Sequence, residues 1–76
     1  MPTVLIVNGY RFYFYSGDRN EPVHVEKGDG VAKIWLEPSL NPQYFEGFKV
    51  KEKKEIFDIA SQNYDLLKAK WNEFFY

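Results

Sequence analysis

His24 is the only histidine in the chain, and the acid Glu26 follows it two positions later. In a β-strand, residues two apart point to the same face, so this pair would lie side by side. A histidine beside a carboxylate can act as a general base, or can hold a metal with help from Asp18 or Glu21. A protein metal site usually needs three or more ligands, so two residues at this spacing do not predict one. The spacing therefore predicts a solvated pair on the open face of a sheet, with neither a metal nor a cofactor.

A second set of residues has the types that bind single-stranded RNA. Aromatic rings can stack on bases, and basic side chains can contact phosphates. The candidates on or near the same sheet face are Arg11, Tyr13, Tyr15 and Lys33. The run Lys49–Lys54 adds four lysines, but two acids, Glu52 and Glu55, dilute it. A chain with one histidine and no recognisable nucleophile motif does not favour catalysis, so His24 and Glu26 stay the only catalytic candidates.

Four aromatic residues close the sequence: Trp71, Phe74, Phe75 and Tyr76. Trp71 and Phe74 continue the apolar stripe of the helix that precedes them, whereas Phe75 and Tyr76 come after it. The four rings can complete the hydrophobic core, or they can form a patch that binds a protein partner or a second copy of the chain. Both alternatives stay open at this point.

The first half of the chain predicts two β-hairpins, over residues 1–38. Runs of β-branched and aromatic residues at 3–7 and 10–15 flank Asn8-Gly9, the strongest short signal for a type I′ turn. A second pair of strands, 22–26 and 31–36, flanks a glycine-containing turn. In the strand over 10–15, the face that carries Phe12 is assigned to the core, because the opposite face carries Arg11, which is costly to bury.

The second half predicts an irregular connection and one long helix. Residues 39–50 directly follow Pro38 and contain Asn41, Pro42 and Gly47, so they favour an irregular connection, with a short edge strand as the alternative. Over 51–75 apolar residues recur at spacings of three and four, which indicates an amphipathic helix. The predicted fold is a single α+β domain over 1–76: an antiparallel sheet of about four strands, with one C-terminal helix packed on it.

Composition limits the partners and the location. The chain has 76 residues, no cysteine, and a formal charge of −1 from 10 basic and 11 acidic residues. This balance argues against a general coat for nucleic acid or membrane, both of which attract basic proteins. No apolar run approaches the length of a membrane span, and no cleavable leader precedes the strands. We therefore expect a cytoplasmic protein that does not bind membranes.

The order of these blocks resembles a known family. Read together, "NGYRFYFYS", "NEPVHVEKGDG", "AKIWLEP" and "KWNEFF" make the chain similar to the small bacterial family catalogued as domain of unknown function 4160. Members usually read E-P-x-H-V-H-V at the second hairpin, whereas this chain has a single His-Val unit at His24. Losing two residues keeps the alternation of the strand but removes a paired-histidine site. Members also often carry serine or threonine before the helix, where this chain has Lys49-Val50.

The resemblance implies a partner rather than an activity. Genes of the family commonly lie beside that of another small protein, in an arrangement like a toxin–antitoxin pair. The favoured hypothesis is thus a protein-interaction module, the toxin-like member of such a pair, with a small cognate protein as partner. An RNA-binding protein or ribonuclease that uses His24 is the alternative. A degenerate family member without chemistry is the third.

Overall fold

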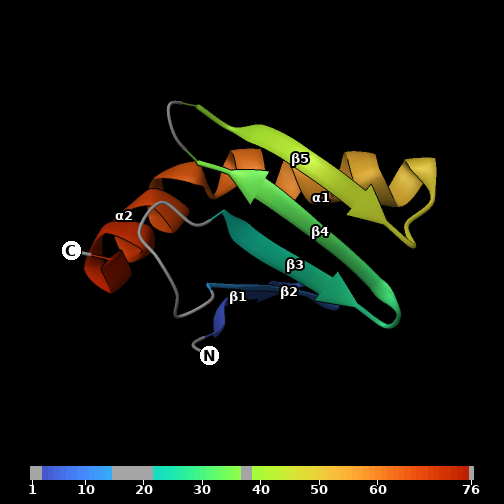
Figure 1. Ribbon diagram of the computed structural model, residues 1–76, viewed down its shortest axis with the longest axis horizontal. Helices are drawn as coiled ribbons and strands as arrows, with labels where there is room; N and C mark the ends of the chain where they lie inside the picture. Colours follow the sequence, from blue (N-terminus) through green and yellow to red (C-terminus); the bar gives the residue numbers. More distant parts are fainter. Residues whose placement is uncertain (1–2, 15–21, 37–38, 76) are drawn as a thin grey trace.

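The computed structural model describes residues 3–14, 22–36 and 39–75, and shows an antiparallel sheet followed by two helices. The five strands follow one another in the sheet in chain order, β1-β2-β3-β4-β5 (Figure 1). Their bounds are β1 Thr3–Val7, β2 Tyr10–Tyr13, β3 Val23–Lys27, β4 Gly30–Trp35 and β5 Asn41–Glu46. The helices are α1 Val50–Gln62 and α2 Tyr64–Phe75. The predicted α+β fold with an antiparallel sheet is confirmed.

The first hairpin forms as its turn predicts. Val7 pairs with Tyr10 across the two-residue turn, and both turn residues have positive φ, 53° at Asn8 and 84° at Gly9. Two positive φ angles are what a type I′ turn requires, and glycine and asparagine adopt them at low cost. The second hairpin closes at Gly28-Asp29, where Lys27 pairs with Gly30. Each hairpin thus has its register fixed by a two-residue turn.

The segment 39–50 is more regular than an irregular connection: the edge strand that the prediction left open is present as β5, six residues long. This strand pairs with β4, and the register shifts between Lys33 and Ile34, where Ile34 lies opposite Pro42. Proline lacks a backbone donor, and for that reason it is confined to edge strands and irregularities, both of which apply here. Pro42, which argued against a regular strand, therefore marks an edge strand.

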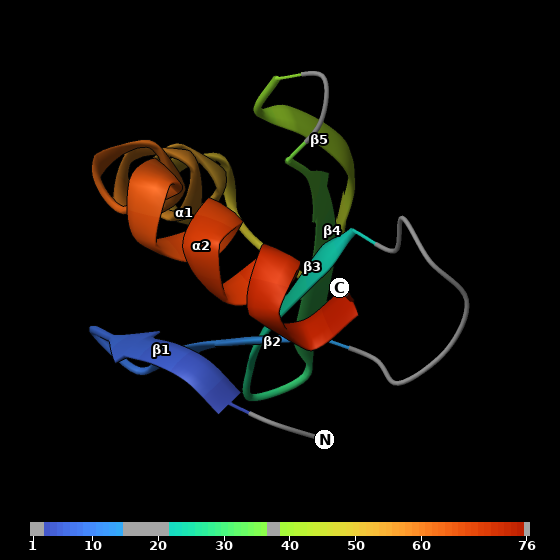
Figure 2. The ribbon, with the colours of Figure 1, turned by 90° about the vertical axis from the view of Figure 1, so that its left-hand side faces the viewer.

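The predicted single helix is divided at Asn63. The Asn63 side-chain amide donates a hydrogen bond of 2.8 Å to the Ile59 carbonyl, which the Asn63 backbone N–H also reaches at 3.1 Å. Such side-chain competition for a helix carbonyl bends or ends helices. The Tyr64 hydroxyl then donates to the Leu36 carbonyl at the end of β4 and fixes the start of α2 to the sheet. With this break, both helices lie on the same face of a twisted sheet (Figure 2).

The first helix begins one residue earlier than predicted, at Val50 rather than at residue 51. Lys49 precedes α1 and is a poor cap, but the Glu52 carboxylate accepts a 2.8 Å hydrogen bond from the Lys49 backbone N–H. This is the return half of a capping box, and it satisfies one of the free donors at the helix start. Glu52 therefore partly compensates for the weak capping residue at position 49.

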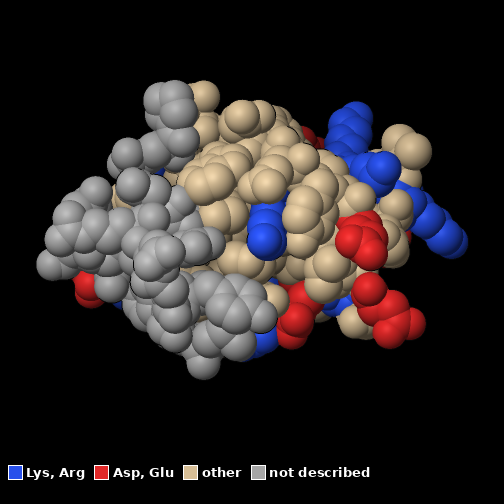
Figure 3. Space-filling model, viewed as in Figure 1, with Lys and Arg blue, Asp and Glu red and all other residues tan. Residues whose placement is uncertain are grey.

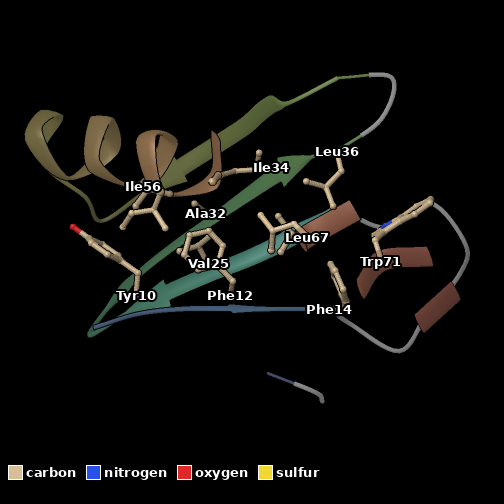
Figure 4. Close-up of a cluster of buried hydrophobic side chains, with 13 residues drawn as sticks. Tyr10, Phe12, Phe14, Val25, Ala32, Ile34, Leu36, Ile56, Leu67 and Trp71 are labelled. Atoms are coloured by element: carbon tan, nitrogen blue, oxygen red, sulfur yellow. The ribbon is translucent and has the colours of Figure 1, made fainter. Parts of the chain in front are cut away.

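The core lies between the helices and one face of the sheet (Figure 4). The Phe12 face of β2 is buried as predicted, and so are the apolar faces of β3 and β4 and the helix stripe. The fully enclosed side chains include Tyr10, Phe12, Phe14, Val23, Val25, Ala32, Ile34, Leu36, Ile56, Ala60, Leu67 and Trp71. At one end, Gly30 leaves room for the Phe48 ring, since a Cβ at Gly30 would meet a ring carbon at 2.5 Å.

Candidate functional site

The sheet face turned away from α1 and α2 is called the outer face here, and it brings most of the predicted site residues together. Cross-strand pairing aligns one row of outer-face residues over all five strands: Thr3, Tyr13, His24, Lys33 and Tyr44. A neighbouring row on the same face contains Ile6, Arg11, Glu26, Val31 and Glu46. Strand alternation thus predicted the shared face correctly.

His24 lies on this outer face, but it is not solvated. Its exposed fraction is only 7%, so the expectation of a histidine in contact with water is wrong. The cause is its position on the central strand, where Tyr13 of β2 and Lys33 of β4 are its direct neighbours across the sheet. The Tyr13 ring stacks on the imidazole, so burial at this position comes from the sheet itself, with no described helix packed over it (Figure 2).

Tyr13 is held between two side chains. Its ring stacks on His24, with centroids 5.4 Å apart and an interplanar angle of 26°, and the Arg11 guanidinium carbon lies 4.4 Å from the ring centroid. Stacked and cation–π contacts of this kind favour a fixed arrangement. Because the ring is also buried, it offers no free face on which a nucleotide base could stack.

Arg11 is engaged as well. It forms a 2.8 Å ion pair with Glu26 and donates a 2.7 Å hydrogen bond from Nε to the Thr3 hydroxyl. The Tyr13 hydroxyl donates a longer bond, 3.4 Å, to the other Glu26 oxygen. The positive charge of Arg11 is therefore largely balanced within the sheet. Glu26, predicted as a partner of His24, instead contacts Arg11 and Tyr13.

The accessible part of the outer face lies over β4 and β5. Tyr44 is 37% exposed, Val31 and Trp35 are half-buried, and the Lys33 ammonium lies 5.7 Å from the Tyr44 ring centroid. Among the described residues, no carboxylate forms an ion pair with Lys33. In Figure 3 the described part of this face is mainly uncharged, with charged side chains gathered toward the end where the β3–β4 turn lies.

Sequence patterns missed Tyr44 and Trp35 as members of this surface. Trp35 could have been found, because it alternates with Val31 and Lys33 along β4. Tyr44 was harder to find, since Pro42 and Gly47 in its segment argued against the strand that places it opposite Lys33.

The remaining predicted residues lie elsewhere. Trp71 is buried in the core, so the core alternative describes this residue and its role as a partner contact is not supported. The side chains of Phe74 and Phe75 lie outside the described part of the structure, as do Tyr76 and Tyr15. Within the described residues, no three His, Cys, Asp or Glu side chains come together as a metal site would need.

A separate ionisable group lies on the core-facing side of β2. Burial raises the pKa of Tyr10 to about 12, and a hydrogen bond to Glu55 together with the negative charges of Glu55 and Glu52 adds to the shift. The phenolate would be buried beside two carboxylates, so the neutral phenol is favoured. The Lys27 ammonium lies 4.6 Å from the centroid of the same ring.

This shift predicts a loss of stability at alkaline pH. An unfolded tyrosine ionises near a pKa of about 10, below the folded value of about 12. The contribution of Tyr10 to the free energy of unfolding is therefore complete below pH 10 and declines as the pH rises toward 12. Urea unfolding of the protein and of Tyr10→Phe across this range should show a difference in stability that shrinks with pH. A difference independent of pH would contradict the raised pKa.

Comparison with known proteins gives one match. The family model described as Domain of unknown function (DUF4160) matches residues 9–72. Comparisons with curated proteins and with solved structures gave no match. In the described part of the chain, neither helix is long and apolar enough to cross a membrane.

Proposed function

The chain belongs to the DUF4160 family, and from the character of its outer face we propose that it is a small protein-interaction module. In this proposal it is the toxin-like member of a two-protein bacterial system, and the small protein encoded beside it is its partner. The observation that carries the proposal is the accessible outer face, where Tyr44, Trp35 and Val31 surround Lys33.

The chemistry of this surface suits a protein partner. Aromatic side chains are enriched among the few residues that carry most of the binding energy of protein interfaces, because they bury a large area with few rotatable bonds. The β-sheet also holds Tyr44 and Lys33 in register before a partner arrives, so little order has to be gained on binding. An exposed fraction of 37% at Tyr44 leaves enough of the ring free to be covered.

Lys33 adds a requirement on the partner. Its ammonium lies among uncharged side chains and has no carboxylate partner among the described residues. Covering it with a purely apolar surface would leave a buried, unpaired charge, which is costly. The partner surface therefore carries a carboxylate opposite Lys33, surrounded by apolar side chains.

The RNA alternative keeps fewer of its contact groups. Tyr13 and His24 are buried and stacked on one another, and Arg11 is paired with Glu26. Only Lys33 is left of the described basic and aromatic candidates, and a single lysine gives little electrostatic attraction for a polyanion. The outer face therefore favours a protein over RNA.

Co-purification tests the proposal. The tagged full chain, produced together with the small protein encoded beside it, should retain that protein in stoichiometric amount. Retention should weaken only modestly as salt rises, because one ion pair contributes little to a mainly apolar interface. Recovery of RNA that is lost steeply with salt would instead support the nucleic-acid alternative. Recovery of neither would support the degenerate member without chemistry, and would overturn the proposal.

A further inference from the structure

The two edges of the sheet are built differently. β5, at one edge, contains Pro42 and ends at the charged Glu46. β1, at the other edge, reads Thr-Val-Leu-Ile-Val and contains neither a charge nor a proline. No described segment lies beyond β1 in either ribbon view (Figures 1 and 2). Charges and prolines normally protect an edge strand from pairing with another chain, so β1 lacks the protection that β5 has.

The pairing register of β1 determines which of its backbone N–H and C=O groups face the open edge. Val7 and Tyr10 flank a two-residue turn, so they form the hydrogen-bonded pair that closes the hairpin. Pairs alternate along an antiparallel ladder, and the next pair, Ile6 and Arg11, is therefore the non-hydrogen-bonded one. The N–H and C=O of Ile6 consequently point away from β2, toward the open edge.

The apolar side chains of β1 are also incompletely buried. Val4, Leu5 and Val7 pack against the core but are only partly buried, whereas Phe12 and Val25 on the next strands are fully buried. Ile6 points to the outer face and is 65% exposed. The apolar side chains of β1 therefore remain partly exposed to solvent.

We propose that β1 pairs with β1 of a second copy of this chain, antiparallel and with a two-fold axis at Ile6. The Ile6 N–H then donates to the Ile6 carbonyl of the second copy, and the reciprocal bond forms by symmetry. Leu5 of one copy lies opposite Val7 of the other and extends the apolar layer, while the two Ile6 side chains cover each other on the outer face. Each contact that one copy makes is also made identically by the other, as a two-fold symmetric interface requires.

This pairing has consequences for strength and for geometry. The register shift between Thr3 and Leu5 limits regular pairing to the end of β1 near the turn. The interface is therefore short, and we expect a weak dimer that depends on concentration. A two-fold axis within a continuous sheet stands perpendicular to it, so both outer faces lie on the same side of the dimer. The inference is independent of the proposed function.

Introducing a positive or a negative charge at Ile6, on the two-fold axis, tests the pairing. Sedimentation of the full chain over a wide range of concentration should show a monomer–dimer equilibrium. Ile6→Lys and Ile6→Glu each bring like charges together at the axis and should weaken self-association by roughly tenfold or more. An equimolar mixture of the two variants should restore the dimer, because opposite charges then meet. Val50→Lys is the matched control, since Val50 is 80% exposed and belongs to α1 rather than to the sheet.

Restoration by the mixture also shows that both variants fold. The pairing is overturned if the protein stays monomeric at all concentrations, or if Ile6→Lys dimerises as well as the control. A monomer whose Ile6 amide becomes protected from hydrogen exchange only when the small protein encoded beside it is added would overturn it too, and would assign the β1 edge to that protein.

Discussion

Replacing Trp71 with alanine is expected to lower the free energy of unfolding by about 3–5 kcal/mol, the usual cost of removing a buried tryptophan. Trp71 is almost fully buried and packs in the same cluster as Phe14, Leu36 and Leu67. In a chain of 76 residues this loss is a large part of the total stability. Urea unfolding followed by circular dichroism measures it directly.

The neighbouring Asn72 provides the control. Its side chain is exposed on the same turn of α2, so Asn72→Ala should change the free energy of unfolding by about 0.5 kcal/mol or less. A Trp71→Ala variant that keeps its stability but no longer binds the proposed small partner would contradict the core assignment. It would restore the hypothesis that the C-terminal aromatic residues form the partner surface.

Replacing Tyr13 with alanine is the second large change. The ring is buried on the outer face between Arg11 and His24. Its removal therefore leaves a cavity and also removes its contacts with both of these side chains. We expect a loss of about 3 kcal/mol in the free energy of unfolding. The same unfolding experiment measures it, and His24 should become accessible to modification by diethyl pyrocarbonate.

Tyr44 is the matched control for Tyr13. It is the same residue type in the same cross-strand row, but it lies on the edge strand and is far more exposed. Tyr44→Ala should cost about 1 kcal/mol or less. If Tyr13→Ala were as harmless as Tyr44→Ala, Tyr13 would not be the centre of a structural cluster, and a role in ligand contact would have to be considered again.

Local rules predicted the parts of the fold that depend on neighbouring residues. Asn8-Gly9 predicted the first hairpin because positive φ is needed at both positions, and alternation predicted that Phe12 faces the core. The helix stripe predicted Ile56, Leu67 and Trp71 as buried residues. Each of these outcomes is determined within a few positions along the chain.

The parts that escaped prediction depend on contacts between distant segments. β5 exists because β4 offers an edge that can accept a strand containing Pro42. The break at Asn63 does not interrupt the apolar stripe, so periodicity could not reveal it. His24 is buried on a central strand, where Tyr13 of the neighbouring strand stacks on it. Alternation gave the face of each outer residue, but its exposure was determined by the neighbouring strands.

The affinity of Tyr44→Ala for the proposed small cognate partner tests the central claim most directly. Phe57→Ala is the matched comparison, because Phe57 is an aromatic residue of α1 with nearly the same exposure, 39% against 37%. If the outer face binds the partner, isothermal titration should show that Tyr44→Ala weakens binding by about tenfold or more, while Phe57→Ala binds as the unmodified protein does. Weaker binding by Phe57→Ala alone would contradict the account and would place the interface on the helices.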